Sequence, residues 1–405
     1  MHEITAVRQD PVPPREPYGK LFWRFLRFGM LAWGGPVSQI AMIRQELVEE
    51  ERWVSRERFN RALALYQALP GPEAHELCVY FGMTARGRFG GFLAGAGFML
   101  PGFVLMYLLS WLYVQYGSAL AALAGLFYGM QPAVAALIVR AIHRIGQHAL
   151  TDYWLWVIAI LTGIADLLGT SFWVTLPFAG LAYLAVKREK YALAGALGIA
   201  FIAITIVFSP FVHLIIPAPA SDLSLRSNAS LLDLLGSGLR TGLLTFGGAY
   251  TAIPLLQHDA VDVNHWMTNA QFLDGIALGG ILPAPLIIFG TFVGYIAGGA
   301  WGALVMTFGV FLPAFGFTLI GHTYLEKLIE HKTLQIFLDG LMAGVVGLIA
   351  SAAITLFGTA VTDLVALGIF LIALLILYRW QAKAAVAVIM LAAGAAGLIF
   401  HAMSK

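Results

Sequence analysis

The chain has 405 residues, of which 60% are hydrophobic and 11% are charged, and its mean hydropathy is +0.81. Soluble globular proteins are about 45–50% apolar and about 25% charged, so the composition excludes that class. The formal net charge of +2 gives no sign of a nucleic-acid partner. The single cysteine, Cys78, excludes an internal disulfide and any cysteine-based metal site.

The first twenty residues are polar and rich in proline, and they lack the apolar stretch of a cleavable signal peptide. We therefore expect residues 1–20 to form a cytoplasmic N-terminal tail. From Leu21 to His401 the sequence is filled with apolar runs of about 20 residues, long enough to cross a bilayer as helices. The alternating ten-residue pattern of a membrane barrel does not occur. The predicted fold class is an all-α polytopic membrane protein.

The second half of the sequence repeats the first when Arg240 is aligned with Arg27, an alignment that we call the repeat register. After a slip of one residue the register continues, and the repeat covers most of the length of the chain. This predicts a first transporter repeat over residues 21–212, a linker rich in proline and serine over 213–232, and a second repeat over 233–405. The matched residues are Arg27 with Arg240, Gly34 and Gly35 with Gly247 and Gly248, Trp53 with Trp266, Pro70 and Pro72 with Pro283 and Pro285, Gly82 with Gly294, and Gly90 with Gly302.

The loops of the two copies carry opposite charge signals. Loops 44–61 and 86–88 of the first copy are rich in arginine, whereas the equivalent loops 257–271 and 295–300 contain neither lysine nor arginine. Because basic loops stay in the cytoplasm, equivalent loops are expected on opposite sides of the membrane. The two homologous repeats are thus predicted to have inverted topology. With 140–151 among the cytoplasmic loops, this assignment places all 24 lysines and arginines inside except Arg226, Arg240 and Lys405.

Each copy contains two apolar segments broken by glycine and proline: 34–36 (GGP) and 69–72 (LPGP), then 247–249 (GGA) and 282–285 (LPAP). Both loops that flank LPGP are basic, and neither loop that flanks LPAP is, which predicts re-entrant hairpins that enter and leave on one side. The GGP segment also has basic residues at both ends. The alternative is that GGP and LPGP each cross fully, which moves the arginine-rich loop outside.

A helix that starts in mid-membrane exposes backbone N–H groups that attract anions. Such irregular backbone is tolerated only where it lines a cavity or is covered by protein. We expect the four breaks to meet and form one anion site at the midplane, as in transporters built from inverted repeats. The alternative is that glycine and proline only kink helices for packing. The candidate substrate-binding residues at the breaks are Gly34, Gly35, Pro36, Ser38, Pro70, Gly71, Pro72, Gly247, Gly248, Thr251, Pro283 and Pro285.

Charged residues near the breaks are further candidates. Arg27 and Arg240 each precede a glycine pair by seven residues, a spacing that places them on the same helix face as the break, and we expect both to contact substrate. Snorkelling to the interface is the alternative for Arg27. Glu73 and His75 follow LPGP, where a carboxylate that competes with the anion would couple proton and anion movement. The alternative for Glu73 is a simple N-terminal capping role.

Four other titratable side chains are predicted to lie outside the site. Asp274 is near a segment end and is expected at the membrane interface. His143, Arg144 and His148 are expected to be ordinary residues of the cytoplasmic loop 140–151.

At these motifs the sequence resembles the chromate ion transporter family of the long-chain, two-domain type. The resemblance covers essentially the whole chain and is carried by "GMLAWGGPVSQI", "LPGP", "FMLPG", "FGGAYTAIP", "LPAP" and "FLPAFG". It implies two homologous halves in opposite orientation. It also implies proton-driven export of chromate across the bacterial inner membrane, which sulfate would inhibit by competition and which would make the cell resistant to chromate. The chain departs from the family pattern at Ala32-Trp33 and at Glu73-Ala74-His75, where small hydroxyl residues are common.

Other functions use the same pattern. The scaffold could carry sulfate, another small anion or an organic carboxylate, and broken helices serve anion channels equally well. An enzyme is disfavoured because the sequence shows no nucleotide loop, metal-ligand spacing or nucleophile–base arrangement, and we expect no cofactor. The expected partners are a small oxyanion and the lipid bilayer. A homodimer is compatible with the sequence.

Cysteine labelling tests the inverted arrangement. Ser55 and Thr268 are equivalent in the repeat register. With Cys78 replaced by alanine, we expect Ser55→Cys to react with an impermeant maleimide from the cytoplasmic side and Thr268→Cys from the opposite side. Labelling of both from one side would contradict the inverted topology.

Overall fold

The structure is a computed structural model that describes residues 11, 13–116, 121–208, 229–322, 324–325, 331–380 and 382–403. Residues 1–10 and 12 of the predicted tail, residues 213–228 of the predicted linker, and the two charge-rule exceptions Arg226 and Lys405 lie outside the described residues.

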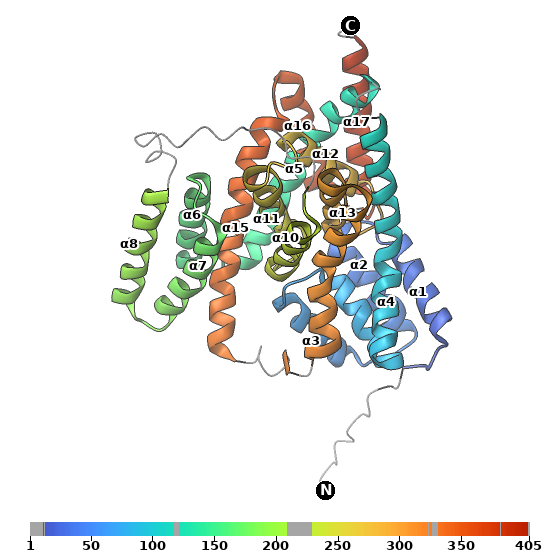
Figure 1. Ribbon diagram of the computed structural model, residues 1–405. Coiled ribbons are helices and arrows are strands. Elements are labelled where there is room, and N and C mark those ends of the chain that lie inside the picture. Colours follow the sequence, from blue (N-terminus) through green and yellow to red (C-terminus); the bar gives the residue numbers. More distant parts are fainter. Residues whose placement is uncertain are drawn as a thin grey trace.

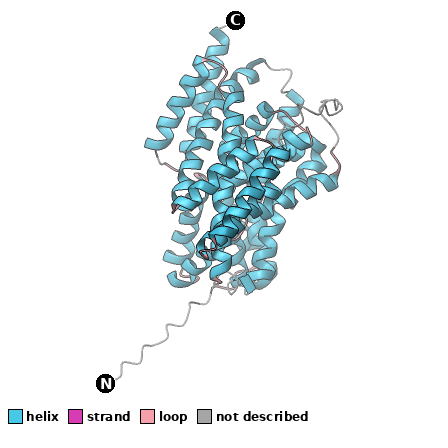
Figure 2. Ribbon diagram, turned by 90° about the vertical axis from the view of Figure 1, so that its left-hand side faces the viewer, coloured by secondary structure: helices cyan, strands magenta, loops and turns pink. Residues whose placement is uncertain are grey.

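The described residues are helical and contain no strand (Figure 2). The first half of the chain forms α1 (Tyr18–Met30), α2 (Gly35–Arg44), η1 (Gln45–Glu50), α3 (Arg56–Ala68), α4 (Glu73–Tyr116), α5 (Ala121–Ala149), α6 (Tyr153–Leu167), α7 (Phe172–Lys187) and α8 (Tyr191–Phe208). The second half forms α10 (Leu231–Leu244), η2 (Ala249–Thr251), α11 (Ala252–Gln257), η3 (His258–Val263), α12 (Asn269–Gly280), η4 (Leu286–Ile288), α13 (Phe289–Gly316), η5 (Phe317–Gly321), α15 (Lys332–Ala360), α16 (Leu364–Arg379) and α17 (Ala385–Met403). In Figure 1, α6, α7 and α8 lie at one edge of the molecule, and α1 and α4 lie at the other.

The same local structures recur at equivalent positions of the repeat register. A π-helix occurs at η1 in the first half and at η3 in the second. Arg52 and His265, which follow these π-helices, both have φ of 52°. Ser55 then caps α3 and Thr268 caps α12, each by accepting a hydrogen bond from a backbone N–H three residues later. The repeat seen in the sequence is therefore also a repeat of backbone conformation.

The long helices α4 and α13 are each interrupted at the same place. Arg86 and Gly87 in α4 have φ/ψ of −142°/29° and 67°/−166°. Gly298 and Gly299 in α13 have −144°/19° and 61°/−151°. These positions are equivalent after the one-residue slip, and the positive φ at the second position favours glycine.

At this interruption α4 folds back on itself. A Cβ atom added to Gly82 would overlap the carbonyl oxygen of Gly90, and one added to Gly95 would lie 2.6 Å from Cγ2 of Val79. Residues before and after Gly87 are therefore side by side, as in a helical hairpin. Gly294 and Gly302 of α13 show the same overlap. Glycine at these contacts lets the two arms touch through their backbones.

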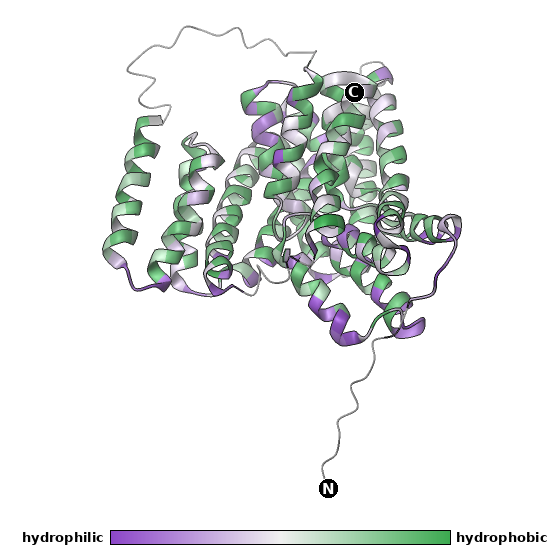
Figure 3. Cartoon of the chain, turned by 60° about the horizontal axis from the view of Figure 1, so that its bottom comes forward, coloured by the Kyte–Doolittle hydropathy of each residue, from purple (hydrophilic) through white to green (hydrophobic). Residues whose placement is uncertain are grey.

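Five described helices are long and apolar enough to cross a membrane: α4, α5, α13, α15 and α17. Length and composition alone count α4 and α13 as single spans, but both reverse direction at their interruption. Each of these helices therefore consists of two arms, and the second arms cover residues 88–116 of α4 and 300–316 of α13. Hydrophobic residues cover most helical turns, and hydrophilic residues gather mainly at helix ends and connections (Figure 3).

The arginine-rich loop of the first half is largely neutralised by its own carboxylates. Arg44 and Arg56 both form ion pairs with Glu49. Hydrogen bonds from Arg56 and, to a lesser extent, from Arg44 lower the pKa of Glu49, although desolvation of the carboxylate acts in the opposite direction. The loop is thus an ion-pair network, and its high arginine content is matched by acidic residues.

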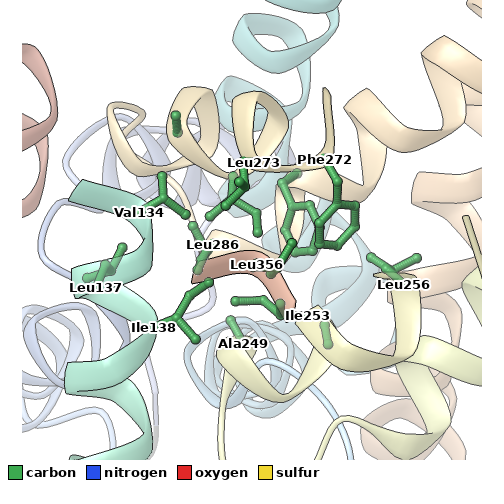
Figure 4. Packing of buried hydrophobic residues seen from close by; sticks show 14 of the residues in the cluster. Val134, Leu137, Ile138, Ala249, Ile253, Leu256, Phe272, Leu273, Leu286 and Leu356 are labelled. Atoms are coloured by element: carbon green, nitrogen blue, oxygen red, sulfur yellow. The ribbon is translucent and has the colours of Figure 1, made fainter. Parts of the chain in front are cut away.

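Helices α5 and α15 form the centre of the molecule. Of their most apolar windows, 67% and 72% are buried, compared with 33% for α4 and α17. Figure 4 shows Val134, Leu137 and Ile138 of α5 facing Ile253 and Leu286 of the second half, with Leu356 of α15 nearby. The broken segments of the second half therefore pack against two central helices, which hold them in place.

The backbone contact at Gly82 predicts a difference between two glycine substitutions. We expect Gly82→Ala to lower the Tm of the purified protein, because overpacking of this kind costs about 1–3 kcal/mol. Gly195→Ala is the control, since Gly195 is exposed on α8 and has no atom within 4 Å of an added Cβ. Equal Tm values for the two variants in a detergent thermal-shift assay would show that the arms of α4 do not touch here.

Candidate anion site at the hairpin tips

The GGP segment is the tip of a hairpin between α1 and α2. Arg24 on α1 contacts Glu46 and also Glu51 at 2.6 Å, although these carboxylates follow α2. One continuous helix could not bring them together, so the chain reverses between Met30 and Gly35. Gly34 caps α2 with φ of 88°, and a Cβ there would lie 2.7 Å from the carbonyl oxygen of Lys383. Both features require glycine.

The LPGP segment is the tip of a second hairpin, between α3 and the first arm of α4. Nε of Arg58 donates a hydrogen bond to the Tyr80 hydroxyl at 2.8 Å. The rings of Phe59 and Phe81 stack with centroids 6.3 Å apart. The start of α3 therefore lies beside the end of this arm, which is the geometry that the re-entrant hypothesis requires.

The second half repeats both hairpins. Nη2 of Arg240 on α10 lies 2.8 Å from Oδ2 of Asp259, beyond the GGA break. A Cβ on Gly275 of α12 would lie 2.5 Å from the ring of Phe292 on α13, beyond the LPAP break. The chain thus reverses at all four breaks that the sequence predicts.

The tips of the hairpins meet. The N–H of Gly71 in LPGP donates a hydrogen bond of 2.8 Å to the carbonyl oxygen of Thr245, just before the GGA break. A narrow void of about 30 Å³ lies between the GGP and LPAP tips. It is lined by Trp33, Gly34, Gly35, Pro36, Leu137, Tyr250, Gly279, Gly280, Leu282, Ala284, Leu286, Lys383, Val386 and Ala387.

A larger cavity of about 570 Å³, which we call the Arg144 cavity, opens beside these tips. Its basic side chains, Arg144 and His148, come from α5, and its acidic side chains are Glu73 and Asp339. The other described lining residues are Pro36, Val37, Gln67, Ala141, Ile145, Ala149, Thr151, Gly247, Gly248, Tyr250 and Met342. A cationic guanidinium therefore shares one cavity with the GGP and GGA tips and the helix start at Glu73.

A second polar cavity of about 740 Å³, which we call the Asp274 cavity, lies near the other end of α5. Gln131 lines the Asp274 cavity, Leu137 the narrow void, and Arg144 the Arg144 cavity. The rise from Gln131 to Arg144 is about 20 Å along the helix axis. Helix α5 thus passes two cavities separated by the hairpin tips.

A family model described as "Chromate transporter" matches residues 19–218 and 232–398 of the chain. The chain belongs to the chromate transporter family. It is 53% identical to the chromate transport protein of Pseudomonas aeruginosa, over 98% of this chain and 96% of that protein.

More distant relatives of the chain differ in length. The chromate transport protein of Cupriavidus metallidurans is 28% identical over 94% of this chain and 92% of its own. The uncharacterized transporter YwrB of Bacillus subtilis is 32% identical over 38% of this chain and 77% of its own. No solved structure matches the chain.

In this chromate transporter family member, several predicted site residues do line the cavities. Pro36, Gly247, Gly248 and Glu73 line the Arg144 cavity. Gly34, Gly35 and Pro36 line the narrow void. The sequence motifs therefore mark the point at which the cavities approach each other.

Other predicted residues lie at the tips without lining either space. Pro70, Gly71, Pro72, Pro283 and Pro285 are buried in the tips, and Ser38 is half-buried on α2. The hydroxyl of Thr251 is buried and donates to the carbonyl oxygen of Gly248 at 2.8 Å. These residues shape the tips through backbone geometry and packing.

His75 is not placed to meet an anion. It is fully buried, and its ring lies between those of Phe311 and Phe315, with centroids 5.0 and 4.7 Å away. The neighbouring Glu76 is also fully buried. Neither side chain has a hydrogen-bond partner among the described residues. Of the two predicted proton-coupling residues, only Glu73 reaches the cavity.

Arg27 and Arg240 lie on the stems of hairpins and line neither the Arg144 cavity nor the narrow void. Arg27 pairs with Glu46, and Arg240 pairs with Asp259. The two acidic partners are themselves equivalent in the repeat register. Each arginine therefore joins the two arms of its hairpin in the same way.

The expectation that Arg144 and His148 belong to a cytoplasmic loop was wrong, because α5 continues to Ala149 and carries them into the cavity wall. Polar residues on the cavity-lining face of a helix lower the mean hydropathy of the segment as much as a loop does, so hydropathy alone cannot distinguish the two. The spacing of four residues between Arg144 and His148 was the available signal, since it places them on one helix face. Asp339, from α15, carried no local signal.

The Arg240–Asp259 pair allows a charge-exchange test. We expect Arg240→Ala to reduce folded protein and transport, because it leaves a largely buried carboxylate unpaired, at a cost of about 3–5 kcal/mol. The exchange Arg240→Asp with Asp259→Arg should restore much of both in detergent stability and flux assays. If the exchanged protein folds but does not transport, the guanidinium itself acts on the substrate.

Proposed function

We propose that this protein is a secondary active transporter that exports chromate from the cytoplasm across the bacterial inner membrane, coupled to protons, and thereby confers resistance to chromate. The observation that carries the proposal is the pair of cavities on α5 with the four hairpin tips between them. A transporter that alternates its access needs a site near mid-membrane and a barrier that can change sides. The tips provide the barrier, and the Arg144 cavity leads to it.

We further propose that the two halves are inverted repeats. Their hairpins, π-helices and interruptions recur in the same order. Their equivalent loops differ in basic charge, which the positive-inside rule assigns to opposite sides. On this assignment the Arg144 cavity opens to the cytoplasm and the Asp274 cavity to the exterior. If the two inverted copies exchanged conformations, an inward-open state would become an outward-open state.

Within the Arg144 cavity, Arg144 is the group proposed to hold the oxyanion. Its planar guanidinium can donate two parallel hydrogen bonds to a tetrahedral dianion, and residues of the GGP and GGA tips line the same cavity. Glu73 and Asp339 line the same cavity as Arg144. A chromate dianion would bind best when these carboxyl groups are protonated, because ionised carboxylates repel it. Anion and proton occupancy are therefore linked in this cavity.

The proposal is tested by flux into proteoliposomes that contain the purified protein. We expect labelled chromate to accumulate only under an imposed pH gradient and to be competed by sulfate. Passive equilibration without dependence on the gradient would identify a channel. Transport of sulfate without chromate would identify a different oxyanion as substrate, and no flux of either anion would contradict the proposed function.

Arg144 gives a sharper test of the site. We expect Arg144→Gln to raise the KM for chromate by about tenfold or more, because a hydrogen bond to a charged group contributes about 1.5–3 kcal/mol. Arg88→Gln is the control: Arg88 is exposed beside the interruption of α4 and lines none of the three spaces described above. A KM for Arg144→Gln equal to that of the control would remove Arg144 from the site.

A further inference from the structure

We propose that Asp274, held by Tyr113 and Gln131, is the group that binds the coupling proton on the side of the molecule opposite to the Arg144 cavity. This inference rests on the proposed function, since it names the proton site of the same transport cycle. The sequence did not indicate this role for Asp274: the residue is only 6% exposed, and its carboxylate faces the Asp274 cavity.

Both oxygens of the Asp274 carboxylate are held by hydrogen bonds. Its Oδ2 accepts a hydrogen bond from the Tyr113 hydroxyl at 2.7 Å, and its Oδ1 accepts one from Nε2 of Gln131 at 2.8 Å. The donors come from α4 and α5, whereas Asp274 belongs to α12. The carboxylate thus links α12 of the second half to α4 and α5 of the first half.

No basic side chain compensates this carboxylate within the cavity. Its described lining residues include no lysine, arginine or histidine, and Asp274 is the sole acidic residue among them. The titratable neighbours are the phenols Tyr113 and Tyr128, and Tyr128 donates to Asp363 at 2.8 Å. From α13, α15 and the connection to α16 the cavity receives Ile296, Thr359, Ala360 and Thr362. A cation from the cavity is what would neutralise Asp274.

The surroundings suit a proton better than a metal ion. Two of the nearest polar groups are donors to the carboxylate, and no group of three metal-ligating side chains occurs among the described residues. When a proton bonds to Oδ2, the charge of the side chain changes from −1 to 0. The Tyr113 hydroxyl can then rotate and accept the new O–H, because a phenol both donates and accepts. Both charge states can therefore be hydrogen-bonded.

Protonation at Asp274 would act on the hairpin tip through α12. The same helix ends at Gly280, and Gly279 and Gly280 line the narrow void between the tips. Neutralising the carboxylate replaces two charge-assisted hydrogen bonds with weaker neutral ones. This loosens α12 from α4 and α5, so proton binding changes the position that α12 can adopt beside the void.

The test compares two modes of chromate flux in proteoliposomes. For Asp274→Asn we expect accumulation driven by a pH gradient to fall at least tenfold, together with chromate-induced proton movement followed by a trapped pH dye. Exchange of labelled for unlabelled chromate at equal pH should stay within about twofold of wild type, because it needs no net proton transfer. Asp233→Asn is the control: it removes one exposed carboxylate in the first turn of α10 and should change neither mode.

The outcomes separate this inference from the proposed function. If wild type accumulates chromate with the gradient and Asp274→Asn does so equally well, Asp274 is not the proton site although the transporter stands. Equal loss of both modes in a folded variant would also overturn the inference, because it indicates a structural role. If Asp274→Asn does not fold, Tyr113→Phe replaces it, and selective loss of the driven mode is again the expected result. Absence of driven flux in wild type would instead defeat the proposed function.

Discussion

The need to pair backbone polar groups away from water governs this structure. An unsatisfied N–H or C=O in the bilayer costs several kcal/mol, so a broken helix is stable only if the protein itself covers the break. In LPGP, Pro70 and Pro72 have no N–H to satisfy. The N–H of Leu69 bonds to a carbonyl oxygen near the end of α3, and the N–H of Gly71 bonds to the carbonyl oxygen of Thr245 in the other half of the chain. A break in one half is therefore covered by the other half.

This cover explains why the breaks and the cavities coincide. Four hairpin tips that must be covered by protein converge on the centre, and their close packing leaves little volume there, as the void of about 30 Å³ shows. Helices α5 and α15 run through the centre of the molecule and pack against the tips. Polar cavities open where α5 leaves the tips, toward Arg144 at one end and toward Gln131 at the other. A barrier flanked by two cavities follows from the packing of broken helices.

Local patterns in the sequence predicted much of this arrangement. Glycine and proline inside apolar runs act on the residues next to them, so the breaks at Gly34 and Pro70 could be located without a structure, and the repeat register located their counterparts. What the sequence could not supply were contacts set by packing. The partner of Arg240 is Asp259, which gives it a stabilising role that spacing alone did not suggest. Arg144 was assigned to a loop because hydropathy does not distinguish a cavity wall from a loop, and the two hydrogen-bond donors to Asp274 could not be read from the sequence.

The two halves repeat the same backbone features but differ in the charges that they carry, so equivalent positions of the two copies are chemically different. Arg61 of α3 is exposed, whereas its equivalent in the repeat register is Asp274, which is buried and hydrogen-bonded. A pair of identical inverted halves would present the same groups to both sides and could not distinguish inward from outward movement. With a guanidinium near one end of α5 and a lone carboxylate near the other, an anion is favoured at one cavity and a cation at the other. The two cavities on either side of the tips therefore differ in the sign of the charge that they stabilise.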